Sequence, residues 1–110
     1  MHIAEQNLEY LFRNLEYCYD RYLRKSDINP DHHFYLDKIY EELGELVTLE
    51  LSRRGFKPGP APDKLEDRIN EEAADLFCQV IVLIIKHKYD IWPKLNEKWL
   101  KELSVGEGGY

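Results

Sequence analysis

A short segment rich in proline and glycine divides the middle of this chain. Residues 55–62 read Gly-Phe-Lys-Pro-Gly-Pro-Ala-Pro. Because proline lacks a backbone N–H and clashes with the preceding turn, no continuous helix crosses this segment. The sequence on each side of it has helical periodicity. The segment therefore predicts two helices joined by a loop, one over about residues 30–54 and the other over about residues 64–89.

Acidic residues lie three positions apart on each side of that loop. Glu42 and Glu45 precede it, and Glu72 and Asp75 follow it. Residues three apart share a helix face, so each pair can point in one direction. Convergent carboxylates are typical ligands of hard cations such as Mg²⁺ or Mn²⁺. We therefore treat these four residues as a candidate set of metal ligands.

The helix that carries the second pair is otherwise strongly apolar. The segment after Asp75 is apolar at almost every position, which predicts burial on several sides. At about 100° per residue, Glu72, Asp75 and Gln79 fall on one narrow polar stripe of this helix. Because unpaired buried carboxylates are unfavourable, the acids should meet a cation or open into a cleft. The alternative is a structural ion pair, in which Arg68 or Lys86 neutralises an acid.

Length and charge limit the classes of protein that this sequence can form. Its 110 residues are enough for one domain, 1–110, and 44% of them are hydrophobic. A net charge of −6 argues against a nucleic-acid partner held by a basic face. No segment is long and apolar enough to span a bilayer, and no signal peptide is visible. We expect a cytoplasmic protein without a membrane or nucleic-acid partner, and a flexible tail from about residue 104.

The periodicity predicts an all-α bundle of about four helices. The first covers about residues 3–25, and a short fourth helix includes residues 94–101. An apolar stripe on the second helix is expected to face the core: Leu36, Ile39, Tyr40, Leu43 and Val47. A chain of this length buries only about two-thirds of its surface. Because the third helix has more apolar faces than one chain can cover, we expect a homodimer or homotetramer.

The fourth helix supplies chemical groups that suit a nucleotide. Asn96, Lys98, Trp99 and Lys101 bring an amide, two cations and a large aromatic ring close together. The lysines would contact phosphates, the amide would bind a base or sugar, and the indole would stack on a base. The alternative is an ordinary amphipathic helix, with the indole packed against the protein and the lysines in water.

Together these motifs resemble the MazG-like family of nucleoside triphosphate pyrophosphohydrolases. The similar features are residues 41–45 (Glu-Glu-x-x-Glu), a connector with proline and glycine, and residues 72–75 (Glu-x-x-Asp). Residues 96–101 are similar to the family's Asn-x-Lys-Phe-x-Arg segment, with Trp for Phe and Lys for Arg. The resemblance covers about residues 35–101. Lysine at position 101 lacks the bidentate fork of arginine, which weakens the match there.

The resemblance implies a helical oligomer that hydrolyses a nucleoside or deoxynucleoside triphosphate to the monophosphate and pyrophosphate. Removal of non-standard nucleotides is one role for such a reaction. The implied Mg²⁺ ligands are Glu42, Glu45, Glu72 and Asp75, and the implied substrate-binding residues are Asn96, Lys98, Trp99 and Lys101. Either Glu41 or Glu45 would orient or deprotonate the attacking water. Dimeric dUTPases, dCTPases and phosphoribosyl-ATP pyrophosphatase belong to the same superfamily, so the resemblance does not imply a particular base.

A protein of a different class accounts for the same residues. In this alternative the chain is a non-catalytic helical interaction protein whose acids form a structural or regulatory metal site. Release of pyrophosphate from a nucleotide distinguishes the enzyme from this alternative.

Overall fold

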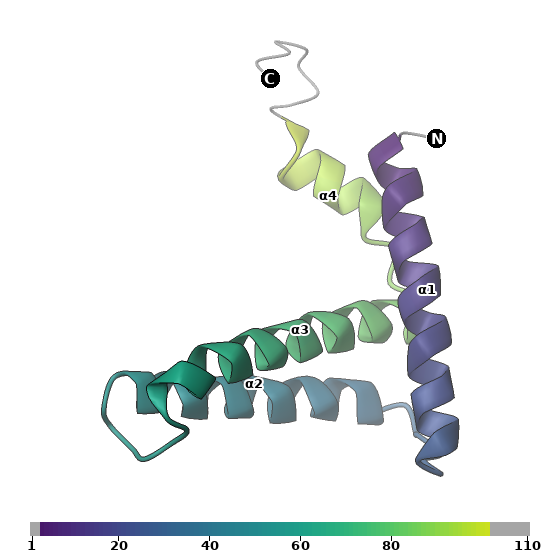
Figure 1. Ribbon diagram of the computed structural model, residues 1–110. Coiled ribbons are helices and arrows are strands. Elements are labelled where there is room, and N and C mark those ends of the chain that lie inside the picture. Colours follow the sequence, from purple (N-terminus) through teal and green to yellow (C-terminus); the bar gives the residue numbers. More distant parts are fainter. Residues whose placement is uncertain (1–2, 102–110) are drawn as a thin grey trace.

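The computed structural model describes residues 3–101, which form four helices and no strand (Figure 1). In chain order the helices are α1 (Ile3–Lys25), α2 (Phe34–Arg53), α3 (Pro62–Lys86) and α4 (Trp92–Lys98). The prediction of an all-α fold with about four helices is confirmed for this part of the chain. The tail from about residue 104 lies outside the described residues. None of the described helices is long and apolar enough to cross a membrane.

The start of α2 is set by an aspartate just before it. The Oδ1 atom of Asp31 accepts hydrogen bonds from the backbone N–H groups of His33 (3.0 Å) and Phe34 (2.9 Å). These bonds satisfy N–H groups that have no partner within the helix. Consequently α2 begins about four residues later than the sequence periodicity predicts.

The end of α2 and the start of α3 follow from the composition of the loop. Gly55 has a φ of 82°, a left-handed conformation that glycine adopts without a steric penalty. The N–H of Phe56 then donates to the carbonyl of Leu51 (2.9 Å) and closes the last turn. Pro62 is the first residue of α3, where its missing N–H leaves no helical bond unmade. The predicted helix–loop–helix arrangement is therefore confirmed.

The helices form an open arrangement. α2 and α3 run antiparallel as a hairpin, and α1 crosses the end of the hairpin opposite its loop (Figure 1). α4 lies beside the N-terminal half of α1 (Figure 1). The radius of gyration is 17.5 Å, whereas a compact domain of this length has a value of about 13 Å. Much apolar surface is therefore left uncovered by the chain itself.

Two apolar clusters hold the hairpin together. The three-helix cluster joins α1, α2 and α3 through Tyr19, Leu23, Tyr35 and Val82. The loop-end cluster joins α2 and α3 nearer their connecting loop, through Leu49, Leu65 and Ile69. Glu42 and Glu72 fill buried positions between these clusters. Two carboxylates thus stand where the packing pattern would ordinarily place apolar side chains.

The outer face of α2 corrects an expectation from the sequence. Four residues of the stripe predicted as core are exposed, and we call them the outer stripe: Leu36 (44%), Tyr40 (69%), Leu43 (43%) and Val47 (48%). A second set on α2, spaced by seven residues, faces α3 instead: Tyr35, Glu42 and Leu49. The prediction favoured the outer stripe because it has more apolar members. A contiguous apolar surface of this kind is typical of a site that meets another protein.

The third helix is only partly covered within one chain. Ile81 and Val82 are buried, and Val82 is fully inaccessible. On the same helix, Phe77 is 54% exposed and Val80 is 38% exposed. One chain therefore covers only part of α3, and burial of its remaining faces by a second copy stays a prediction.

Candidate metal centre

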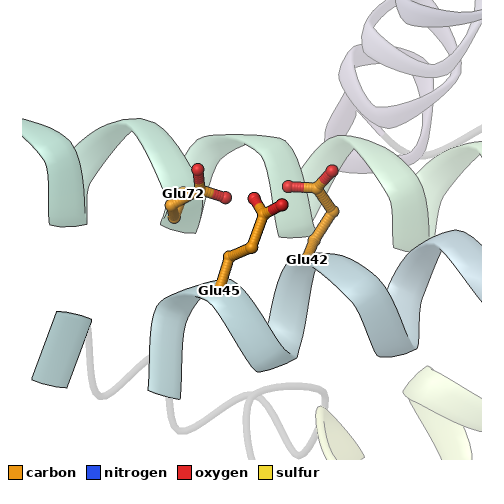
Figure 2. A group of neighbouring side chains, drawn as sticks. All are labelled: Glu42, Glu45 and Glu72. Carbon is orange, nitrogen blue, oxygen red and sulfur yellow. The ribbon is translucent and has the colours of Figure 1, made fainter. Parts of the chain in front are cut away.

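Three of the four predicted ligands come together across the hairpin. Glu42 and Glu45 of α2 and Glu72 of α3 each offer one carboxylate oxygen, and these oxygens all lie within 4.8 Å of one another. The three side chains point toward a common space between α2 and α3 (Figure 2). We call them the carboxylate group. Its donor set consists of oxygen atoms alone, which suits Mg²⁺ or Mn²⁺ rather than a soft metal.

Two members of the carboxylate group are buried without full compensation. Glu42 is 8% exposed and Glu72 is 7% exposed. The Oε2 atom of each is inaccessible and has no hydrogen-bond partner among the described residues. A buried polar atom without a partner is rare in folded proteins and costs about 1–3 kcal/mol, and more when it is charged. A bound cation would satisfy both atoms, so the residues present fit a divalent metal ion.

The cations proposed to neutralise these acids are engaged elsewhere. The Nζ atom of Lys86 contacts Glu16 (3.1 Å) and Asp20 (2.9 Å) of α1. Arg68 contacts Glu71, with its Nε atom 3.7 Å from the carboxylate. Structural ion pairs therefore exist, but those of Arg68 and Lys86 do not include the carboxylate group.

A lysine that the sequence analysis did not single out lies next to the group. Lys38 donates a hydrogen bond to Glu41, and its Nζ atom is 3.8 Å from Oε1 of Glu42. Its position four residues before Glu42 was the available signal, because residues at that spacing share a helix face. Lys38 offsets part of the charge of Glu42 but leaves the other buried oxygen unpaired.

The crowding of acids changes their affinity for protons. Burial, and next the adjoining carboxylate of Glu42, raise the pKa of Glu72 above its ordinary value. Contact with Glu72, and next burial, raise the pKa of Glu45. Like charges that share a site disfavour full ionisation of that site. Without a cation, the group therefore tends to retain a proton.

Asp75 lies beside the carboxylate group but is not part of it. It is exposed on the next turn of α3 after Glu72. It lines a cavity of about 290 Å³, which we call the tyrosine cavity. The lining of this cavity includes Tyr19, Tyr22, Lys38, Glu42, Asp75 and Gln79. Asp75 thus shares a cavity with one member of the group and stands next to another along its own helix.

A second hollow adjoins the group at Glu45, nearer the loop end of the hairpin. We call it the arginine hollow; it has a volume of about 520 Å³ and is lined by Glu41, Gly44, Glu45, Thr48, Leu49 and Arg68. Glu41, the predicted alternative to Glu45 in handling water, is exposed on this side. The two predicted water-handling residues therefore line one hollow.

A buried amide and a tyrosine line the tyrosine cavity. The hydroxyl of Tyr19 donates to the Oε1 atom of Gln79 (3.0 Å), and Gln79 is 7% exposed. The amide nitrogen of Gln79 has no hydrogen-bond partner within residues 3–101. Gln79 was visible in the sequence as part of the polar stripe of its helix, whereas no motif pointed to Tyr19.

The predicted substrate-binding residues lie apart from the carboxylate group. Asn96 and Lys98 belong to α4, and Trp99 and Lys101 follow it. Lys98 and Trp99 line a separate shallow hollow, and Trp99 is 74% exposed. α4 lies beside α1, away from the part of the hairpin that carries the carboxylates (Figure 1). Within one chain, the fold does not bring these residues to the acids.

Comparison with known proteins adds no relative. No protein-family model, no curated protein and no solved structure matches this chain.

Proposed function

We propose that this protein is a Mg²⁺-dependent nucleoside triphosphate pyrophosphohydrolase. It would convert a nucleoside or deoxynucleoside triphosphate and water into the monophosphate and pyrophosphate. The observation that carries the proposal is the pair of buried glutamates, Glu42 and Glu72, each with an unpartnered oxygen in a group of three carboxylates. Mg²⁺–phosphate chemistry uses a ligand set of this kind.

The residues that would hold the cation are Glu42, Glu45, Glu72 and Asp75. The first three already converge, and Asp75 lies one turn from Glu72 and lines a cavity with Glu42. When bound, Mg²⁺ or Mn²⁺ supplies positive charge against phosphate oxygens and makes water a better acid. That ion would offset the negative charge of the carboxylate group.

Glu45 is the better candidate to accept the proton of the attacking water. Glu41 is hydrogen-bonded to Lys38, whereas Glu45 belongs to the carboxylate group and also lines the arginine hollow. In the proposed step, the water oxygen forms a bond to the α-phosphorus as its proton passes to Glu45. The bond from that phosphorus to the bridging oxygen breaks, and pyrophosphate leaves with the electron pair.

We also propose that a second copy of the chain covers the outer stripe of α2. The four residues of this stripe are apolar, contiguous and exposed, and a two-fold dimer is the commonest way to bury such a surface. A dimer, or a tetramer built from two dimers, would also offer a route for the residues of α4 to reach nucleotide. Within one chain these residues stand apart from the acids.

The exposed outer stripe supports a second candidate function as well. A non-catalytic interaction protein with a regulatory metal site would need an apolar docking surface and an acidic ligand set. This candidate predicts metal binding without hydrolysis of any nucleotide.

A nucleotide panel with product analysis tests the proposal. The protein is incubated with common and non-standard triphosphates and Mg²⁺, and pyrophosphate and orthophosphate are measured separately. Glu72→Gln should abolish pyrophosphate release, while Glu9→Gln, an exposed position on α1, should leave it unchanged. Absence of turnover for every nucleotide, in a folded protein that binds Mg²⁺, would favour the non-catalytic candidate.

A further inference from the structure

We infer that the arginine hollow binds the terminal phosphates of the substrate, with Arg68 as the contacting cation. The nucleoside then lies in the tyrosine cavity. This inference rests on the proposed function and adds the orientation of the substrate. It assigns a binding role to Arg68 and gives a reason for the glycine at position 44.

The arginine hollow adjoins the carboxylate group. Glu45 belongs both to the carboxylate group and to the lining of the arginine hollow. Arg68 precedes Glu72 by four residues on α3, so their side chains leave the same face of the helix. A polyphosphate in the hollow would therefore lie between the acids that hold the cation and a guanidinium.

Arg68 is accessible to a ligand in the hollow. Its side chain is 51% exposed, and its Nε atom is 3.7 Å from Glu71. Among residues 3–101, Glu71 is its only ion-pair partner, and the nearest atom in that pair is Nε rather than a terminal nitrogen. A guanidinium presents such nitrogens as a fork that binds two phosphate oxygens at once. Lys38, the cation of the tyrosine cavity, is already committed to Glu41.

The arginine hollow is also lined by a glycine that the packing of the chain does not explain. Gly44 lies in the middle of α2, and a Cβ atom added there would meet no atom within 4 Å apart from its chain neighbours and the backbone of its own helix. The packing of this chain therefore does not require glycine, although glycine lowers the stability of a helix. Glycine would instead keep the edge of the arginine hollow open. The hydroxyl of Thr48, one turn along α2, lines the same hollow and adds a neutral donor.

The linings of the two spaces decide the orientation. The tyrosine cavity has the rings of Tyr19 and Tyr22 and the amide of Gln79, which suit a base or a sugar. The arginine hollow has no aromatic side chain in its lining. The side with the aromatic rings is therefore assigned to the nucleoside, and the side that carries Arg68 is assigned to the phosphates.

Titration with inorganic pyrophosphate in the presence of Mg²⁺ tests the role of Arg68 by calorimetry. We expect Arg68→Gln to weaken pyrophosphate binding at least tenfold and to leave the affinity for Mg²⁺ alone unchanged. The matched control is Arg13→Gln, which removes the same charge from an exposed position on α1. Equal affinity of the wild type and Arg68→Gln for pyrophosphate would overturn the inference, as would failure of the wild type to bind it.

Gly44→Ala provides a second test, in which the stability of the protein should increase while its affinity for pyrophosphate decreases. We expect a higher Tm, because alanine favours the helix, together with weaker pyrophosphate binding. Asn70→Ala, at an exposed position of α3 outside both hollows, should raise the Tm without affecting binding. A Gly44→Ala protein that binds pyrophosphate normally would contradict the inference. So would a change in its mass by light scattering, because Gly44 would then serve contact between copies.

The same experiments separate this inference from the proposed function. If only the inferred orientation of the substrate is wrong, Arg68→Gln will bind Mg²⁺ normally and hydrolyse the nucleotide at the normal rate. If the proposed function is wrong, the wild-type protein will neither bind Mg²⁺ nor release pyrophosphate from any nucleotide.

Discussion

Glu42 of α2 and Glu72 of α3 face a common space across the hairpin, and each keeps one buried carboxylate oxygen without a partner within the described residues. The two residues occupy core positions between the two apolar clusters. The fold therefore contains a local destabilisation that a cation would remove. The first three predictions follow from this relationship.

Mg²⁺ should stabilise the folded protein. A ligand that binds only the folded state adds about 2.7 kcal/mol to the free energy of unfolding at a hundredfold excess over its Kd. We expect the Tm measured by calorimetry to rise when millimolar Mg²⁺ or Mn²⁺ replaces a chelator. Glu72→Gln should shrink this rise, and Glu9→Gln should not. An unchanged Tm in the wild type would argue against a preformed metal site.

Replacement of a buried carboxylate by an apolar side chain should stabilise the metal-free protein. In Glu72→Leu, a side chain of similar size removes both the repulsion and the unpaired oxygen. We expect the free energy of unfolding without metal to increase by about 1 kcal/mol or more. Urea denaturation in the presence of a chelator measures this free energy. If Glu72→Leu is less stable than the wild type and still responds to Mg²⁺, the assigned role of Glu72 is wrong.

The stability of the metal-free protein should fall as the pH rises from about 4.5. Burial raises the pKa of Glu72, and contact with Glu72 raises that of Glu45, from an ordinary value of 4.5. A group with a raised folded pKa stabilises the fold fully below its unfolded pKa. That contribution is lost as the pH rises through the folded pKa. Denaturation at several pH values should show this loss in the wild type and less of it in Glu72→Gln. If the stability of the two proteins changes with pH in the same way, this prediction is wrong.

The outer stripe of α2 should mediate self-association. Tyr40 is 69% exposed in the middle of this stripe, so Tyr40→Glu would place a charge in the proposed contact between copies. We expect the wild type to be a dimer or tetramer and Tyr40→Glu to dissociate, as measured by light scattering. Tyr17→Glu is the control, since Tyr17 is similarly exposed (62%) on α1. A folded wild-type monomer at micromolar concentration would rule out this assembly.

The ion pairs of Lys86 should hold α1 on the hairpin. Lys86 of α3 contacts Glu16 and Asp20 of α1, and all three side chains are partly exposed. Because solvent and salt screen such pairs, Lys86→Met should lower the free energy of unfolding by only about 1 kcal/mol. The difference between the two proteins should shrink in high salt. A decrease in the free energy of unfolding that does not depend on salt would indicate that packing of the lysine side-chain methylenes, and not its charge, stabilises the fold.

The sequence predicted the helices and most of the carboxylate group well. Proline and glycine around residues 55–62 fixed the loop, and the spacing of Glu42, Glu45 and Glu72 placed them on facing sides of the hairpin. These features are local, since they depend on a few neighbouring residues. The start of α2 was less predictable, because the side chain of Asp31 decides it.

The sequence alone could not show which face of α2 packs against α3. Both the outer stripe and the set of Tyr35, Glu42 and Leu49 have helical spacing. The set that faces α3 includes an acid, so hydrophobicity pointed to the other one. The two hollows were also not predictable, because each combines residues distant in sequence, such as Gly44 and Arg68. The position of α4 likewise depends on contacts that no local pattern encodes.

The separation of the two apolar clusters has a consequence for hydrogen exchange. The loop-end cluster of Leu49, Leu65 and Ile69 is divided from the three-helix cluster by the carboxylate group. Without a cation, the tip of the hairpin can open while the part that contacts α1 stays closed, so its amides exchange as an independent cooperative unit. A cation held by both helices would couple the two units, and the amides around Leu49 and Leu65 would then exchange at the rate of global unfolding.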